Sequence, residues 1–303
     1  MSRDDRDSSW QHGAMQGSGV ETGRLATGPG VEIAWERRGA GPRTLLVPSA
    51  SWLAADLDGL LPGATLVFHD LRGRGRSSAI LDETLLGLSQ DLADVEALRG
   101  YLGLESMSIL GWSYHGLLAA RYALEHPGRV ERLVLVGPSG PRLSPWFGQF
   151  LNNLARSLDL ESLREIDALR RTGARDKDPA GWCRAVHGAF FHSYVADASV
   201  LARMRSDPCV EPNLDAERVN DQGRKVIEKL GDYDWIAEFS GLETPTLILH
   251  GEKDPVPIGG SEDWVRALPR AELVRLAGVG HMPWLEAPER FFPVIRRFLE
   301  LEP

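Results

Sequence analysis

The sequence predicts an α/β fold in which a mostly parallel central sheet is flanked by helices. Short apolar segments alternate along the chain with longer segments whose apolar residues recur at helical spacing. The short segments are apolar throughout, as expected for parallel strands that helices cover on both faces of a sheet. The chain is long enough to bury a large core without disulfide bonds.

The first half of the chain carries most of these elements. Strands are predicted over residues 31–39, 44–49, 64–70, 107–111 and 130–137, and helices over 89–103 and 116–128. Ser89 is the predicted N-cap of the first helix and Gly103 its stop, while Pro127 and Gly128 end the second helix. A turn follows the first strand at residues 40–42.

The alternation stops after residue 140. Helical patterns cover 151–171 and stretches near 180–206 and 215–230, and no convincing strand occurs among them. A strand at 244–251, a helix at 263–269, a strand at 271–277 and an amphipathic helix at 287–300 then follow. We therefore predict a core of residues 24–140 and 240–303 with an inserted helical cap of residues 141–239. Residues 1–23, rich in Ser, Gly, Asp and Arg, are predicted to form a disordered tail.

Composition restricts the class of protein. The 303 residues are 43% hydrophobic and carry a net charge of −9, which is typical of a soluble globular protein and argues against nucleic acid as a main partner. No stretch approaches the ~18 apolar residues of a membrane span, and the first residues lack a signal-peptide pattern. The two cysteines, Cys183 and Cys209, are too few for a disulfide framework and match no metal motif. These features predict a reducing, cytoplasmic setting and no membrane partner.

The segment GWSYHG at residues 111–116 places Ser113 between a predicted strand and a predicted helix. One interpretation is a nucleophile exposed on a sharp strand-to-helix turn. The other is a helix N-cap, a position that serine favours. A nucleophile would benefit from the amides at the helix N-terminus, that of Tyr114 included, because they can stabilise an oxyanion.

A nucleophilic serine needs a base and an acid that orients it. Asp254 follows the strand at 244–251, and His281, the only histidine beyond Asp254, follows the strand at 271–277. Their order after Ser113 is that of serine enzymes of this fold type. The alternatives are an Asx turn at Asp254, a structural role for His281, Asp263 or Glu262 as the acid, and a structural role for His250 beside the acid.

Together these segments resemble the α/β-hydrolase superfamily. GWSYHG, HGEKDP and GVGHMPWLE are similar to its elbow, acid and histidine segments, and HDLRGRGRSS at 69–78 resembles the turn after its fourth strand. The resemblance spans roughly residues 24–300, and LGDYDW with TPTLILHGEKDPVP is similar to the proline iminopeptidase-like group. It implies a Ser113–His281–Asp254 triad. A serine at the elbow, in place of aspartate, argues against haloalkane dehalogenase or epoxide hydrolase chemistry.

Two positions depart from the family pattern. VPSASW at 47–52 stands where the family usually has a His-Gly pair, so the second oxyanion donor is predicted at the amide of Ala50, with Ser51 as the alternative. Ser49 or Ser51 could add a hydroxyl contact. His115 occupies an elbow position that usually holds a small residue, and we expect it to pack locally and not to act as the base.

The cap is expected to shape an aromatic, fairly apolar pocket. The tryptophans near the motif loops or in the cap are the candidates, although any one of them could be a core residue: Trp52, Trp112, Trp146, Trp182 and Trp284. Cap side chains with a possible role in binding are His187, His192, Tyr194, Glu211, Asp215 and Glu217; packed or solvated histidines are expected here. The glycines of the motif at 70–77 are expected to permit a tight turn and not to bind phosphate.

The main functional hypothesis is a serine hydrolase that cleaves a small ester, lactone or amide through an acyl-enzyme. The same triad could serve acyl transfer, C–C bond hydrolysis, lyase chemistry or an iminopeptidase. A non-catalytic ligand-binding protein is the third hypothesis. The chemistry implies a small-molecule substrate, needs no metal or organic cofactor, and leaves the oligomeric state open.

Overall fold

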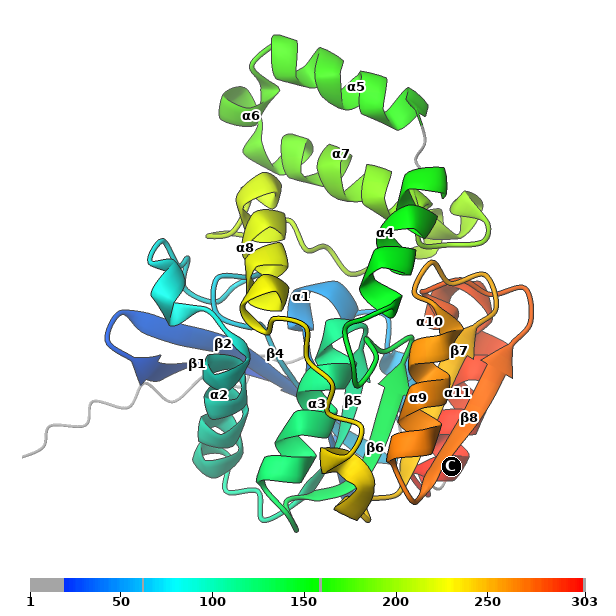
Figure 1. Cartoon of the computed structure of the whole chain (residues 1–303). Helices are drawn as coiled ribbons and strands as arrows, with labels where there is room; N and C mark the ends of the chain where they lie inside the picture. Colours follow the sequence, from blue (N-terminus) through cyan, green and yellow to red (C-terminus); the bar gives the residue numbers. More distant parts are fainter. Residues whose placement is uncertain (1–18, 62, 158–159, 302–303) are drawn as a thin grey trace, which may run out of the picture.

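The computed structural model describes residues 19–61, 63–157 and 160–301. An eight-stranded sheet has the order β1-β2-β4-β3-β5-β6-β7-β8 (Figure 1). Strand β2 is antiparallel to both of its neighbours, β1 and β4, and the other pairs are parallel. The strands are β1 (Val20–Gly28), β2 (Val31–Arg38), β3 (Arg43–Pro48), β4 (Ala64–His69), β5 (Met107–Trp112), β6 (Val130–Val136), β7 (Thr246–Gly251) and β8 (Ala271–Leu276). The predicted fold class is confirmed.

Helices cover both faces of this sheet. They are α1 (Ala50–Leu53), α2 (Leu88–Tyr101), α3 (Tyr114–Glu125), α4 (Trp146–Ser157), α5 (Leu160–Arg171), α6 (Ala174–Lys177), α7 (Pro179–His192), α8 (Ala216–Lys229), α9 (Ile258–Ala267), α10 (Pro283–Glu286) and α11 (Pro288–Phe298). One apolar cluster joins α2, α3 and α9 to one face of the sheet, and a second joins α1, α10 and α11 to the other. Neighbouring strand residues such as Leu45 and Leu46 fall in different clusters because side chains alternate along a strand.

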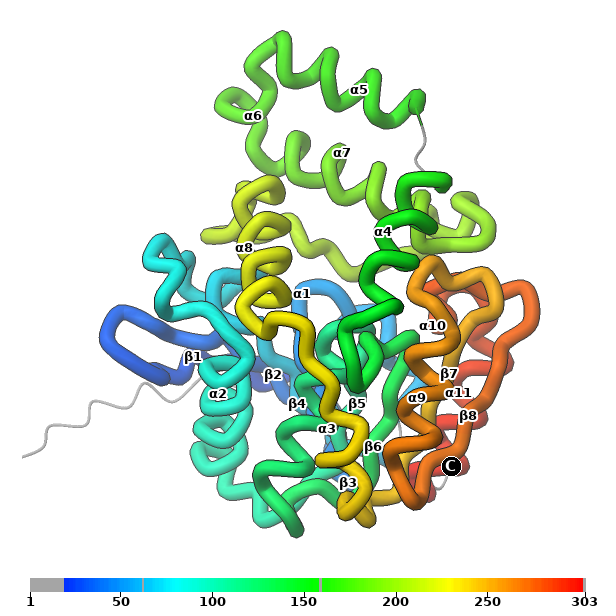
Figure 2. The backbone as a smooth tube through the Cα atoms, in the orientation of Figure 1, coloured from blue at the N-terminus to red at the C-terminus, as the bar shows by residue number. Residues whose placement is uncertain are grey.

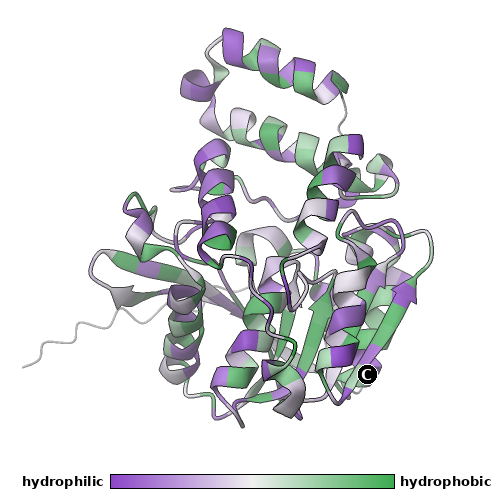
Figure 3. Cartoon of the chain, in the orientation of Figure 1, coloured by the Kyte–Doolittle hydropathy of each residue, from purple (hydrophilic) through white to green (hydrophobic). Residues whose placement is uncertain are grey.

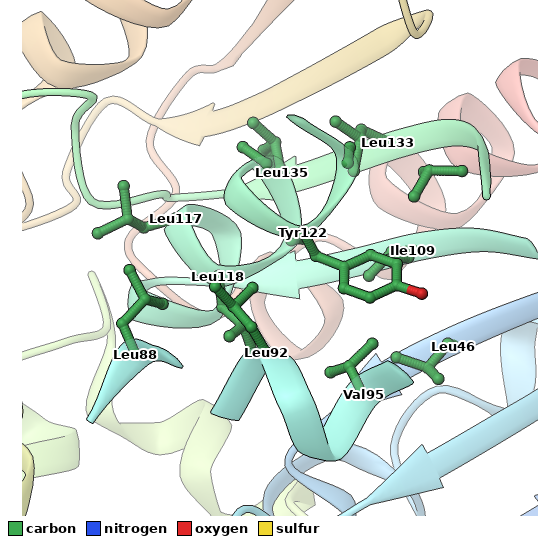
Figure 4. Packing of buried hydrophobic residues seen from close by; sticks show 14 of the residues in the cluster. Leu46, Leu88, Leu92, Val95, Ile109, Leu117, Leu118, Tyr122, Leu133 and Leu135 are labelled. Atoms are coloured by element: carbon green, nitrogen blue, oxygen red, sulfur yellow. The ribbon is translucent and has the colours of Figure 1, made fainter. Parts of the chain in front are cut away.

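The core explains why the central strands are apolar throughout. Figure 4 shows the layer between α2, α3 and the sheet, with Leu88, Leu92 and Val95 from α2, Leu117, Leu118 and Tyr122 from α3, and Leu46, Ile109, Leu133 and Leu135 from the strands. Each fully buried leucine contributes roughly 1.5–3 kcal/mol relative to exposure. Colouring by hydropathy shows largely hydrophobic central strands, while hydrophilic and hydrophobic residues are mixed along the helices (Figure 3).

Strand β1 and the start of helix α2 differ from the sequence prediction. Strand β1 starts at Val20, inside the predicted tail of residues 1–23, and pairs with β2 along its length. It is an edge strand in which only Leu25 is buried, so its composition resembles that of a tail. The first 18 residues lie outside the described part of the chain. Helix α2 begins at Leu88 with Gly87 as N-cap, and the hydroxyl of Ser89 donates to Gln90 instead.

The helices α4 to α8 are inserted between β6 and β7. They lie beyond the carboxyl ends of the parallel strands, with α5 to α7 farthest from the sheet (Figures 1 and 2). The two connections to the core meet at a short neck, where Arg142 forms an isolated bridge with Asp234 and the amide of Leu143 donates to Tyr233 O at 2.9 Å. None of the described helices is long and apolar enough to cross a membrane.

The two cysteines are bonded to each other, in contrast to the prediction from the sequence. Cys183 on α7 and Cys209 form a disulfide bond, with their Cα atoms 5.7 Å apart. The bond lies in a small apolar cluster with Trp182, Val186 and Ala216 that gives the inserted helices a core of their own. Because disulfides are rare in reducing compartments, the pairing removes the support that free cysteines would lend to a cytoplasmic location. That location stays a prediction.

Candidate active site

Ser113 occupies the turn between β5 and α3. Its φ of 58° and ψ of −124° place a non-glycine residue in a strained region of backbone space, which is common at functional turns. Its side chain makes no capping hydrogen bond to α3, so the N-cap interpretation does not account for this serine. The turn requires close backbone approach: a Cβ atom on Gly111 would lie 2.2 Å from His115 O.

Asp254 and His281 lie in the loops that follow β7 and β8. Oδ2 of Asp254 lies 2.7 Å from Nδ1 of His281, and both side chains are buried. Oδ1 of Asp254 also accepts from the amide of Val256 at 2.7 Å, so the aspartate forms an Asx turn and contacts the histidine at once. With Nδ1 engaged, Nε2 is the ring nitrogen left for other partners. Ser113 and His281 line the same small cavity of about 220 Å³.

The loop that carries His281 is fixed at several points. Trp112 donates from Nε1 to His281 O at 2.9 Å, and the amide of His281 donates to Tyr194 O at 2.7 Å. The carboxylate of Glu286 accepts from the amides of Gly280 and Met282 and, across the gap to the inserted segment, from that of Ala196 at 2.8 Å. Glu286 belongs to GVGHMPWLE, but no feature of the sequence indicated this role.

The structure distinguishes between the two oxyanion donors considered at the loop after β3. The amide of Ser51 donates to Oδ1 of Asp70 and its hydroxyl to Oδ2, both at 2.7 Å. Asp70 also accepts from the amide of Arg76 at 3.0 Å, so it fixes the turn of the 69–78 motif. The amides of Ala50 and Tyr114, each the first residue of a helix, make no such contact with a carboxylate among the described residues, and both stay the predicted oxyanion donors.

His115 contacts the loop after β3. Its Nε2 lies 3.0 Å and its Nδ1 3.3 Å from Oγ of Ser49, whose φ of 81° is left-handed. Burial, with a smaller effect of Arg74, lowers the pKa of His115 to about 3, so the ring is neutral at pH 7. Ser49 and His115 both line the small cavity with Ser113. The ring thus has a partner near the turn and is directed toward Ser49.

A second cavity of about 740 Å³ extends from Ser113 beneath the inserted helices. Trp52 and Tyr194 line both cavities, Trp146 lines the large one, and Trp112 lines the small one. Two residues that were predicted to line the pocket lie elsewhere. Ser51 is turned to Asp70, and Trp284 packs behind Trp112 with ring centroids 5.1 Å apart; neither is among the described residues that line these cavities.

The other candidates have structural partners. His250 bonds Oγ of Ser261 at 2.8 Å and Val256 O at 3.0 Å, and Asp263 pairs with Arg142 at 2.8 Å. Glu262 pairs with Arg275, and Asp215 and Glu217 both pair with Arg175. Glu217 also lines the large cavity, as does His187, whose ring lies 4.9 Å from that of Trp52. Trp182 is buried among the inserted helices.

One trio of metal-ligand side chains occurs among the described residues: Cys183, His187 and Cys209. Their ligand atoms lie within 4.8 Å of one another, but the two sulfur atoms are bonded to each other. A thiolate, and not a disulfide sulfur, is the form that ligates metals. The two cysteines therefore form a covalent link and offer no thiolate beside His187 in this structure.

The sheet order, the strained serine turn and the Asp254–His281 contact together define an α/β hydrolase. A family model described as alpha/beta hydrolase fold matches residues 49–288, and the chain belongs to this family of hydrolases.

Relatives agree with this assignment. The chain is 29% identical over 272 residues to a pimeloyl-[acyl-carrier protein] methyl ester esterase of Nitrosomonas europaea, covering 84% of this chain and 95% of that protein. It is 24% identical to a proline iminopeptidase of Heyndrickxia coagulans, covering 83% and 86%. The solved proline iminopeptidase-related protein of Thermus thermophilus superposes with a TM-score of 0.67 at 22% identity, covering 93% and 98%.

Proposed function

We propose that the protein is a serine hydrolase that cleaves a small ester, lactone or amide. Ser113 is the nucleophile, His281 the general base and Asp254 the residue that orients the imidazole. The observation that carries the proposal is the 2.7 Å contact between Asp254 and His281 beside a cavity that Ser113 also lines. The strained, uncapped serine turn supports the same assignment.

The chemistry follows from these positions. Oγ of Ser113 attacks the substrate carbonyl while Nε2 of His281 takes its proton, and Asp254 stabilises the imidazolium that forms. The amides of Ala50 and Tyr114 donate to the oxyanion. Collapse expels the alcohol or amine, which receives the proton from His281. A water molecule then attacks the acyl-enzyme with the same base, and Ser113 is released.

The helices α4 to α8 act as a cap in this proposal. The large cavity lies beneath them and is lined largely by apolar side chains of α4, α5 and α7, among them Phe147, Phe150 and Ile166. Such a surface favours an apolar group on the substrate. The esterase among the relatives supports an ester as the scissile group.

The alternative chemistries share this site and are distinguished by their products. The experiment is turnover of a panel of short esters, lactones, aminoacyl amides and vinylogous diketones, with and without an added acceptor alcohol. We expect ester or lactone hydrolysis with free acid as the main product. If the main product instead came from transfer to the acceptor, from C–C cleavage or from amides alone, the protein would catalyse that reaction with the same triad. Ligand-induced thermal stabilisation with no turnover would favour the non-catalytic alternative.

Gly137 provides a test of the acid–histidine pair. A Cβ at this position would lie 2.6 Å from Oδ2 of Asp254 and 2.7 Å from Nδ1 of His281. We expect Gly137→Ala to lower kcat for an ester substrate at least tenfold, because the pair must separate. Gly128→Ala is the matched control, since Gly128 also has a positive φ but has no atom within 4 Å of an added Cβ.

Both variants should lose about 1 kcal/mol of unfolding free energy through backbone strain, measured by urea unfolding, and Gly137→Ala should lose more because a buried hydrogen-bonded pair separates. Only Gly137→Ala should lose activity. Equal kcat in the two variants would show that this contact does not control the reaction.

A further inference from the structure

Arg74 is the cationic group of the small cavity that lacks a close acidic partner. It is half-buried in the motif at 69–78 and lines the cavity together with Ser113 and His281. The one hydrogen bond of its side chain among the described residues runs from a guanidinium nitrogen to Val219 O at 3.5 Å, and no described carboxylate forms an ion pair with it. A guanidinium stays protonated in proteins, so Arg74 brings a positive charge into the cavity.

The other charged groups of this cavity are already engaged. Arg72 donates two hydrogen bonds to Asp94, at 2.8 and 2.6 Å. Asp91 accepts from the hydroxyl of Tyr114 at 3.0 Å. The two histidines have partners as well, His115 in Ser49 and His281 in Asp254.

Asp91 offsets the charge of Arg74 only in part. Burial raises the pKa of Asp91 to about 7, against the opposing effects of the Tyr114 hydroxyl and of Arg74. Burial therefore disfavours the charged form of Asp91, which weakens it as a counter-charge for Arg74. A partly desolvated cation without a full counter-charge is costly, and an anion that binds beside it recovers part of that cost.

The guanidinium of Arg74 packs against helix α8 of the inserted segment. A Cβ on Gly223 of α8 would lie 2.7 Å from the terminal nitrogen of Arg74, so this glycine lets the side chain lie against the helix. Gly223 also lines both cavities, as do Trp52, Ser113 and Tyr194. The two cavities therefore meet at the nucleophile, with a large, mostly apolar space of about 740 Å³ on one side and a smaller space of about 220 Å³, which Arg74 lines, on the other.

We infer that Arg74 is an anion-recognition residue, and that the substrate is an ester with a bulky apolar group on one side of the scissile bond and a short carboxylate-bearing group on the other. This inference rests on the proposed serine hydrolase. The guanidinium pairs with the carboxylate by charge-assisted hydrogen bonds and so orients the scissile carbonyl toward Ser113. Arg74 takes no part in proton transfer.

The test compares matched esters that differ in charge. One set is 4-nitrobenzyl hydrogen glutarate, the corresponding glutaramate, and the 4-nitrobenzyl ester of 4-(trimethylammonio)butanoate. A second set places the carboxylate or its carboxamide on the alcohol side, as naphthoyl esters of 3-hydroxypropanoate and 3-hydroxypropanamide. The native protein should prefer the carboxylate over the carboxamide in kcat/KM in at least one set.

Variants assign this preference to Arg74. Arg74→Gln should reduce the carboxylate-to-carboxamide ratio by about 10- to 100-fold, the range expected for a lost charged hydrogen bond, and Arg74→Lys should restore part of it. Gly223→Ala, a substitution that favours the helix, should reduce the ratio in the same direction by displacing the guanidinium. Arg129→Gln removes a charge from an exposed surface residue and should leave the ratio at its native value.

The outcomes separate this inference from the proposed function. Binding of the same esters to Ser113→Ala by calorimetry tests the subsite even where turnover is slow. A ratio near one in the native protein, a preference for the ammonium ester, or equal losses for both esters in Arg74→Gln would overturn the anion site while leaving the serine hydrolase intact. Failure of Ser113→Ala to stop turnover would overturn the function on which the inference rests.

Discussion

Replacing Ser113 by alanine is expected to reduce kcat/KM for an ester substrate by about 10⁴-fold or more, to a residual rate. The loss is large because no acyl-enzyme can form without Oγ, and the other groups can then act only on a direct attack by water. The hydroxyl makes no capping bond to α3, so its removal costs the helix little. The variant should therefore keep its circular dichroism spectrum and melt within a few degrees of the native protein.

The measurement is the initial rate of hydrolysis of a short-chain nitrophenyl ester by purified native and variant protein. A trace of contaminating esterase sets the floor, so both proteins are prepared in parallel. If the folded alanine variant kept more than a few per cent of native activity, another residue would have to be the nucleophile.

Asp254→Asn is expected to lower kcat by about 10³- to 10⁴-fold. The asparagine oxygen can still accept from the amide of Val256, as Oδ1 does now, so the loop should keep its shape. The amide nitrogen would then face Nδ1 of His281 in place of the carboxylate oxygen. Because an amide N–H donates, Nδ1 would become the acceptor and the ring proton would move to Nε2, which could no longer take the proton of Ser113.

The control for this variant is Asp82→Asn. Asp82 is an exposed N-cap whose side chain accepts from the amide of Thr84, and asparagine caps equally well. It should retain native kcat and KM. A decrease below tenfold in Asp254→Asn, measured with saturating ester at neutral pH, would mean that the carboxylate does not orient the base.

Most of the sheet could be predicted because its strands are buried on both faces. Segments such as Leu45–Val47 and Ile109–Leu110 have to be apolar in every position, and that signal is visible without coordinates. Strand β1 lies at the edge and buries only Leu25 fully, so it has no comparable signal. The start of α9 at Ile258 was also missed, because its first turn contains two glycines and a serine, Gly259, Gly260 and Ser261.

The site residues were predictable to the extent that they follow strands. Ser113 comes directly after β5, and Asp254 and His281 lie in the loops that follow β7 and β8; parallel strands bring such positions to one edge of the sheet. The choice between Ala50 and Ser51 depended on the side chain of Asp70, which only the folded chain brings to the amide of Ser51. The disulfide, the role of Glu286 and the isolation of Arg74 likewise depend on packing between distant segments.

The central claim is that Ser113 is activated by His281, and covalent labelling tests it most directly. The native protein is treated with a fluorophosphonate probe, digested and mapped by mass spectrometry, beside Ser113→Ala and His281→Ala. We predict one adduct per chain on the peptide that contains Ser113, none in Ser113→Ala, and much slower labelling in His281→Ala. Labelling of a different residue, no labelling of the folded native protein, or an undiminished rate in His281→Ala would contradict the account.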